Sequence, residues 1–193
     1  MTEILTTLAI AFDLPILDWI QANLQSGFMD TFMPFITKFG DHGTFWMIVA
    51  AILFIIPRTR KTGLGMAIAM MIGLLICNVT LKPLVGRIRP YDLQAELGIT
   101  IQLLGERMHD FSFPSGHTIA SFEAAVVLLK NSKKMGIPAM ILAILISFSR
   151  LYLYVHYPTD VIASVILGIG LAFLGKFLVQ KGYDLYEKRK LSA

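Results

Sequence analysis

Charged residues are scarce in this chain. Asp, Glu, Lys and Arg make up 16% of its 193 residues, whereas hydrophobic residues make up 55%. A water-soluble domain of this size usually carries about a quarter charged residues, most of them on its surface. The shortage therefore argues against a soluble fold and indicates that the lipid bilayer surrounds much of the protein.

Cysteine is almost lacking as well. Cys77 stands alone inside an apolar run, so a disulfide within the chain is excluded and we expect this residue to serve in packing. Repeats and flexible linkers are lacking too, so we expect residues 1–193 to form a single domain. The N-terminus lacks the basic start and small-residue cleavage site of a secretory signal and is expected to belong to the mature protein.

The net charge of +4 does not indicate nucleic acid. Lys and Arg residues are scattered between apolar segments and form no continuous basic face, which is the pattern that nucleic-acid binding requires. We therefore expect the bilayer, and no nucleic acid, as the large partner of this protein.

Apolar segments are abundant. Five of them carry little charge: residues 43–57, 63–81, 115–129, 136–148 and 159–179. Because a spanning helix needs about 20 residues, the shorter segments must extend into flanking polar residues whose side chains reach the interface. The pattern predicts an all-α, polytopic membrane bundle of five to six transmembrane helices, with the catalytic helices within residues 43–180.

Residues 1–42 are the ambiguous part of this pattern. The stretch is apolar enough for a sixth span, but Asp13, Pro15 and Asp18 interrupt it, and unpaired carboxylates are costly in lipid. We favour helices that lie in the membrane interface, such as residues 13–25. One face of that segment is apolar: Leu14, Leu17, Ile20 and Leu24.

Basic residues indicate the orientation. They gather at three places: Arg58, Arg60 and Lys61; Lys130, Lys133 and Lys134; and Lys181, Lys188, Arg189 and Lys190. Five helices threaded alternately place all three clusters on one side, which the positive-inside rule makes cytoplasmic. We therefore expect a multi-pass protein of the plasma membrane with a cytoplasmic tail at 181–193. The polar connections 82–114 and 150–158 then face away from the cytoplasm.

Three groups of polar residues lie at helix ends on this second side. They are KPLVGRIRP from Lys82 to Pro90, PSGH from Pro114 to His117, and SRLYLYVHYPTD from Ser149 to Asp160. The three groups resemble the signatures KxxxxxxRP, PSGH and SRxxxxxHxxxD of the type 2 phosphatidic acid phosphatases, and each signature is complete. Their order and spacing extend the resemblance over residues 43–180.

Three permanent cations stand in these groups: Lys82, Arg89 and Arg150. An isolated charge beside lipid is costly, so an anionic partner is expected. Arg offers a planar fork for two phosphate oxygens and Lys a compact charge, and both suit the charge that develops during phosphoryl transfer. Anchoring of lipid headgroups is the alternative for any one of these cations alone.

Ser115, Gly116 and His117 open a helix. Free backbone N–H groups and the positive end of the helix dipole would point at an oxyanion, and Gly116 allows close approach. An ordinary helix start with Ser115 as N-cap is the alternative. The resemblance implies that His117 is the general acid that protonates the leaving oxygen.

His156 precedes Asp160 by four residues, with Pro158 between them as a first helical residue. Asp160 could accept the N–H of one ring nitrogen and leave the other as a nucleophilic lone pair. The resemblance implies these same roles and a phosphohistidine intermediate. The residue types would also suit zinc. However, the three cations would repel a divalent ion, so we expect no metal and no cofactor.

We therefore expect a metal-independent lipid phosphatase. The resemblance implies hydrolysis of undecaprenyl pyrophosphate, with phosphatidylglycerophosphate or phosphatidic acid as alternative substrates. A transporter of phosphate or anionic lipid is an alternative of another class, but it would not need paired histidines and an orienting aspartate.

Two further ionisable residues lie outside the signatures. Glu123 falls within an apolar segment, where we expect either a buried carboxylate bonded to a neighbouring helix through Asn78 or a role near the substrate channel. Arg87 is expected to contact lipid phosphates.

Overall fold

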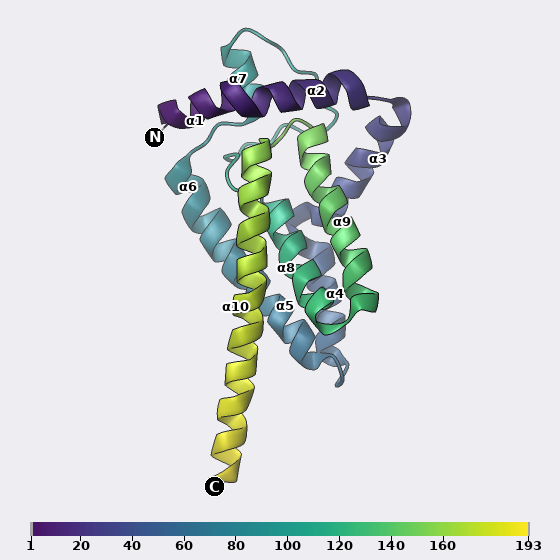
Figure 1. Ribbon diagram of the computed structural model, residues 1–193, viewed down its shortest axis with the longest axis vertical. Coiled ribbons are helices and arrows are strands. Elements are labelled where there is room, and N and C mark those ends of the chain that lie inside the picture. The colour runs from purple at the N-terminus through teal and green to yellow at the C-terminus, as the bar shows by residue number, and fades with distance from the viewer. Residues whose placement is uncertain (1, 193) are drawn as a thin grey trace.

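The protein is a bundle of helices. The computed structural model describes residues 2–192, and within them it contains no strand. The helices are α1 (Thr2–Leu8), α2 (Leu14–Leu24), α3 (Gly27–Thr37), α4 (Thr44–Ile55), α5 (Arg60–Gly73), α6 (Lys82–Val85), α7 (Pro90–Glu96), α8 (Gly116–Asn131), α9 (Lys133–Tyr152) and α10 (Pro158–Leu191). Figure 1 shows α4, α5, α8, α9 and α10 running alongside one another. The predicted all-α membrane fold is confirmed.

Four helical segments in the described part of the chain are long and apolar enough to cross a membrane. They are Gly27–Ile55, Arg60–Glu96, Lys133–Tyr152 and Pro158–Leu191. Helix α8, at 16 residues, is the short member of the bundle. The structure thus supports a multi-pass membrane protein. The number of five to six spans remains a prediction.

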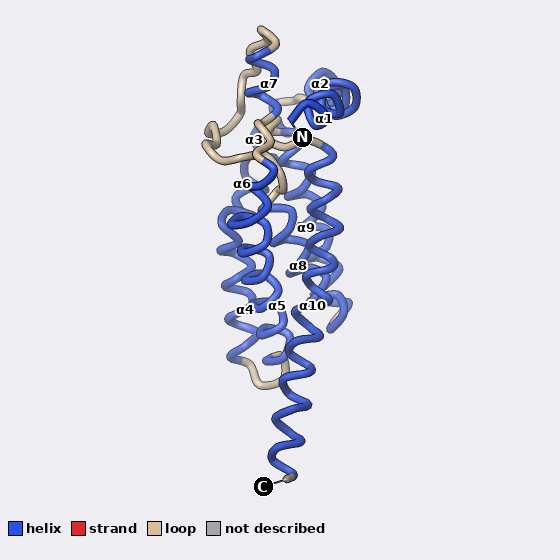
Figure 2. Tube along the Cα trace, turned by 90° about the vertical axis from the view of Figure 1, so that its left-hand side faces the viewer, coloured by secondary structure: helices blue, strands red, loops and turns tan. Residues whose placement is uncertain are grey.

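The N-terminal helices lie across one end of the bundle (Figures 1 and 2). Helices α1 and α2 are joined by a π-helical turn at Ala9–Asp13. Leu14, Leu17 and Ile20 form the apolar face of this segment, and they are buried against the protein. Leu24 packs at the edge of the same cluster, beside the loop between α9 and α10.

The first apolar segment enters the bundle at Gly27, earlier than the predicted start at residue 43. Helices α3 and α4 form it together, joined by a 3₁₀ turn at Lys38–Gly43. Asp30 is accommodated here because its carboxylate accepts a hydrogen bond of 2.5 Å from the Tyr152 hydroxyl. A carboxylate with a hydrogen-bond partner costs less free energy to bury in an apolar environment than a carboxylate without one.

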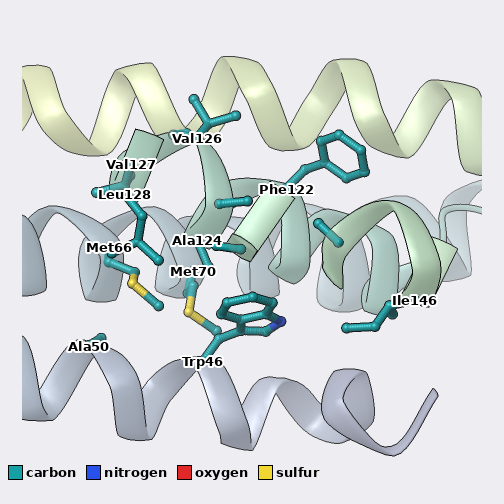
Figure 3. Packing of buried hydrophobic residues seen from close by; sticks show 14 of the residues in the cluster. Trp46, Ala50, Met66, Met70, Phe122, Ala124, Val126, Val127, Leu128 and Ile146 are labelled. Atoms are coloured by element: carbon teal, nitrogen blue, oxygen red, sulfur yellow. The ribbon is translucent and has the colours of Figure 1, made fainter. Parts of the chain in front are cut away.

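Helix α8 forms the centre of the bundle. It contacts α4, α5, α9 and α10, and its residues from Thr118 to Leu128 are almost all buried. Figure 3 shows its Phe122 and Leu128 packed with Trp46 of α4 and Met70 of α5. The Trp46 indole also donates a hydrogen bond of 3.0 Å to Ser121, which satisfies its only polar atom.

Chain direction alternates through the bundle, so the connections divide into two groups. The turns at residues 56–59 and 132 lie at the end toward the C-terminus, whereas the long 97–115 loop and the 153–157 turn lie at the opposite end, where α1 and α2 cross the bundle (Figures 1 and 2). The three signatures therefore meet at one end of the bundle, and the basic clusters lie at the other.

Candidate active site

Lys82 and Arg89 bind a carboxylate of their own chain. Asp110, in the 97–115 loop, forms ion pairs with the Lys82 ammonium and, at 2.5 Å, with the Arg89 guanidinium. Partial burial would raise the pKa of Asp110, but the two cations outweigh it and lower that pKa to about 2. These cations are thus arranged to hold an oxyanion, and Asp110 supplies one.

The 153–157 turn holds the Arg89 side chain in place. Its Nη1 donates a hydrogen bond of 2.7 Å to the carbonyl oxygen of Val155 and lies 3.4 Å from Nε2 of His156. Only 1% of Arg89 is exposed, so its remaining N–H groups point to partners within the protein. The guanidinium therefore approaches the nitrogen that faces away from Asp160.

Arg150 ends α9 as a second buried guanidinium. Its Nη1 donates a hydrogen bond of 2.6 Å to the Thr37 hydroxyl, and its Nη2 lies 3.7 Å from the sulfur of Met108. Its Nε is buried and has no hydrogen-bond partner. An unpartnered donor on a buried cation is costly, and a bound oxyanion would satisfy it.

Ser115 is the N-cap of α8. Its hydroxyl accepts a hydrogen bond from the backbone N–H of Thr118, and its own N–H donates to the Ser164 hydroxyl at 2.8 Å. A β-carbon at Gly116 would lie 3.3 Å from the Asn78 side chain, so glycine fits this close approach to the π-helical segment Leu74–Leu81 that follows α5. The first amides of α8 thus begin next to His117.

His117 has a carboxylate partner from the N-terminal part of the chain. Its Nε2 lies 2.8 Å from a carboxylate oxygen of Asp41, which is located in the 3₁₀ turn before α4. The other ring nitrogen, Nδ1, has no partner among residues 2–192. One nitrogen is therefore oriented by Asp41, and the other is free to meet a ligand.

His156 lies in the turn before α10 and is buried. Its Nδ1 is 3.6 Å from a carboxylate oxygen of Asp160, within ion-pair distance but longer than a hydrogen bond. Burial, with the positive charges of Arg89 and Arg150, holds the pKa of His156 well below its usual value. The ring is therefore neutral near pH 7, as a nucleophile requires.

Asp160 is the best-connected carboxylate of the site. One oxygen accepts hydrogen bonds from the Ser112 hydroxyl at 2.5 Å and from the Tyr157 backbone N–H at 3.1 Å. The other oxygen is ion-paired with Arg87. These contacts fix the carboxylate against the Nδ1 face of His156.

Arg87 does not contact lipid, and that expectation is wrong. Its side chain is 4% exposed and bridges Asp160 to Asp13, whose carboxylate lies 2.7 Å from Nη2. Its guanidinium also stacks 3.8 Å from the centre of the Tyr157 ring. Two buried carboxylates and an aromatic face thus compensate the charge of the buried guanidinium.

Glu123 lies away from this cluster, against α5. Its carboxylate occupies the space beside Gly73, where a β-carbon would come within 2.1 Å of Oε1, and that oxygen has no hydrogen-bond partner in the described residues. Asn78 instead lies beside Gly116. The expected link between Glu123 and Asn78 is therefore wrong.

Sequence reasoning missed the partners of the signature residues. Three aspartates outside the signatures bind side chains that lie within them. Asp13 binds Arg87, Asp41 binds His117 and Asp110 binds Arg89. The interruption of an apolar stretch by Asp13 was the available signal, because a carboxylate in such a place needs a partner. Within residues 2–192, no group of three or more His, Cys, Asp or Glu side chains has the arrangement of a metal site.

The arrangement has the parts that phosphoryl transfer requires. A neutral imidazole, a second imidazole with its own carboxylate and three cations surround one region at the start of α8. Cations and helix-start amides stabilise the negative charge of a phosphoryl group while it is transferred from the leaving oxygen to the attacking atom.

Comparisons with known proteins agree with this geometry. The model of the PAP2 superfamily matches residues 62–183. An undecaprenyl-diphosphatase of Sulfolobus acidocaldarius is 36% identical over 86% of this chain and 77% of its own. The solved structure of Aquifex aeolicus LpxE superposes with a TM-score of 0.73 at 26% identity, over 86% of this chain and 94% of its own. A PAP2-type phosphatidylglycerolphosphate phosphatase from Bacillus subtilis gives 0.64 at 26% identity, over 91% and 96%. The chain therefore belongs to the PAP2 superfamily and is a membrane hydrolase of phosphate esters.

Proposed function

We propose that the protein hydrolyses a polyprenyl diphosphate of the undecaprenyl type to the monophosphate and inorganic phosphate. The relative with the printed name undecaprenyl-diphosphatase supports this substrate. The single observation that carries the chemistry is that Nε2 of His156 lies 3.4 Å from Arg89, in the region that Arg150 and Lys82 also face.

In the first step, Nε2 of His156 attacks the terminal phosphorus in line with the bond to the bridging oxygen. That P–O bond breaks, and His117 donates a proton to the departing lipid phosphate. Lys82, Arg89 and Arg150, with the hydroxyl of Ser115 and the amide of Gly116, hold the three equatorial oxygens. The product is a phosphoramidate on His156, and Asp160 stabilises the positive charge that its ring acquires.

In the second step, a water molecule attacks the same phosphorus from the side that the lipid phosphate has left. His117, now neutral, accepts the proton of this water as it attacks. The P–N bond breaks, inorganic phosphate leaves, and His156 returns to its neutral state. No metal ion takes part in either step.

The position of the site suits a substrate whose chain stays in the bilayer. The cations lie at the ends of the membrane helices, so the diphosphate can reach them while the polyprenyl chain remains among lipid tails. The enzyme would act in the plasma membrane with the site on the extracytoplasmic side. Residues 43–180 would carry the catalytic bundle of a single domain, and residues 181–193 its cytoplasmic tail.

Support for this sidedness comes from the basic turns at the far end of the bundle. A cysteine introduced at Gly105, in the exposed part of the 97–115 loop, should react with an impermeant thiol reagent in intact cells. Cys77 is buried and supplies the low background of this test. Reaction only after the cytoplasmic side is opened would reverse the orientation.

A phosphatidylglycerophosphate is the second candidate substrate, favoured by the likeness to the Bacillus subtilis structure, and phosphatidic acid is a third. Phosphate release from all three lipids, measured in detergent at equal mole fraction, would rank them. A highest kcat/KM on the diphosphate supports the proposal, and a higher value on either phospholipid overturns the choice of substrate.

The catalytic role of His156 needs a separate experiment. Phosphate release is measured with EDTA present for the wild type, for His156→Ala and for His109→Ala. His109 is an exposed imidazole and serves as the matched control. We expect release to be abolished in His156→Ala alone. Release that persists in this variant removes His156 as the nucleophile, and loss of wild-type release with EDTA removes the metal-free mechanism.

A further inference from the structure

We propose that Asp41 is a positioning residue for the reaction, which holds His117 through Nε2 so that Nδ1 meets the leaving oxygen. The inference rests on the role proposed for His117, but not on which lipid phosphate is the substrate. Asp41 lies outside the residues 62–183 that the family model matches. The N-terminal part of the chain would thereby contribute to the chemistry as well as to the packing.

The contact itself has the geometry of an orienting hydrogen bond. Nε2 of His117 lies 2.8 Å from Oδ1 of Asp41, and the His117 side chain is 13% exposed whereas that of Asp41 is 48% exposed. Asp41 thus reaches the ring from the open side of the site. The contact spans 76 residues of sequence, so it exists only in the folded bundle.

The backbone around Asp41 is shaped for this contact. The turn leaves helical geometry at Asp41, and His42 and Gly43 follow with φ angles of 52° and 66°. This left-handed corner turns the carboxylate toward α8, and Gly43 adopts it without strain. A β-carbon at Gly40 would lie 2.6 Å from Cδ2 of His117, so the imidazole packs directly on the backbone of the same turn.

The pairing determines which nitrogen can react. With Asp41 as acceptor, the neutral ring carries its proton on Nε2 and a lone pair on Nδ1, the form that accepts a proton from water. The protonated ring carries a second proton on Nδ1, the form that donates to the departing oxygen. One orientation of the ring therefore serves both steps, and no ring flip is needed between them.

The other charged groups around the ring act in the opposite direction. Burial disfavours a protonated imidazole most, and the positive charges of Arg150 of α9 and Lys82 of α6 disfavour it further. The other imidazole near the ring, that of His156, is neutral. Asp41 is the carboxylate that stabilises the protonated form, which the general acid must adopt before the first step.

The test compares Asp41→Asn and Asp41→Ala with Asp30→Asn. Asp30 is a matched control because it also lies in the N-terminal part and makes one hydrogen bond, to Tyr152, without contacting either histidine. Activity is measured as kcat/KM against pH on whichever lipid phosphate the wild type turns over fastest. We expect kcat to fall by about tenfold or more in both Asp41 variants and to hold in the control.

The pH profile separates positioning from a structural role. Loss of the carboxylate makes the protonated ring less stable, so the alkaline limb of kcat/KM should move to lower pH in Asp41→Asn. Asp41→Glu, which restores the charge, should return the limb toward the wild-type position. A limb that stays in place in Asp41→Asn, or an activity equal to that of Asp30→Asn, overturns the proposal. Failure of His156→Ala to stop phosphate release would instead count against the mechanism as a whole.

Discussion

Asp13 in the N-terminal segment and Arg87, at a variable position within the first signature, form a buried ion pair, with 2.7 Å between carboxylate oxygen and guanidinium nitrogen. Arg87 continues this link to Asp160, which faces His156. Thr159 completes the group, because its backbone N–H and its hydroxyl both donate to Asp13. The N-terminal segment is thus connected through two ion pairs to Asp160, the residue that faces the proposed nucleophile.

Arg87→Met should destabilise the protein strongly, because it leaves two buried carboxylates without their cation. Loss of one partner of a buried ion pair costs about 3–5 kcal/mol. Urea unfolding in detergent micelles, followed by circular dichroism, measures the change in the free energy of unfolding. Arg107→Met is the control, since Arg107 is exposed in its pair with Asp92 and should leave the midpoint unchanged. Equal midpoints for the two variants would contradict the buried network.

Asp110→Asn should strengthen the binding of inorganic phosphate as a competitive inhibitor. The carboxylate occupies Lys82 and Arg89 and, with a pKa of about 2, stays ionised at every pH of an ordinary assay. An anion must therefore compete with it. A partly exposed ion pair is worth up to about 1 kcal/mol, so the inhibition constant should fall by up to about fivefold. A constant that rises would show that Asp110 assists anion binding, and Asp92→Asn controls for the loss of one charge.

Activity should persist on the acid side of neutral pH. The nucleophile must be unprotonated, and burial with the adjacent guanidinium groups holds the pKa of His156 well below 6.5. The acid limb of kcat/KM should therefore lie well below pH 6.5, and nitrogen NMR of labelled histidine should show a neutral ring there. The unfolded chain does take up this proton below about pH 6.5, so folding stability should decrease as the pH falls through that region. An acid limb centred at the usual histidine value would contradict the prediction.

Gly40→Ala should reduce kcat by about tenfold or more, because displacement of a catalytic group by about 1 Å is costly. The new methyl group would overlap both His117 and the Ile146 side chain, which lies 2.9 Å from its position. Gly27→Ala is the matched control, since a β-carbon there meets no atom within 4 Å. Both variants are assayed for phosphate release and for thermal midpoint. Unchanged turnover in Gly40→Ala would show that the ring can shift without penalty.

The signatures allowed a candidate site to be predicted from the sequence, because they place five residues at helix ends that alternate threading brings to one side: Lys82, Arg89, His117, Arg150 and His156. The membrane class and the all-helical fold followed from the lack of charge and the apolar runs. Local patterns of this kind depend on neighbours in the chain, and they are readable without knowledge of the packing.

Contacts between distant segments were not readable in this way. Asp41 and His117 are separated by 76 residues, and no periodicity relates a 3₁₀ turn to the start of α8. Arg87 was misassigned for the same reason, since its two carboxylate partners lie 74 and 73 residues away along the chain. The first apolar helix also begins at Gly27 rather than at residue 43, and the bond that accommodates its Asp30 comes from Tyr152, 122 residues away along the chain.

The enclosure of α8 by other helices has a practical consequence. Its neighbours α4, α5, α9 and α10 separate it from the surrounding lipid, so lipid or detergent molecules contact mainly these outer helices. Replacement of the bilayer by a detergent micelle should leave the amides and the imidazole at the head of this helix in place. Kinetic constants measured on purified protein would then describe the same catalytic geometry that operates in the cell.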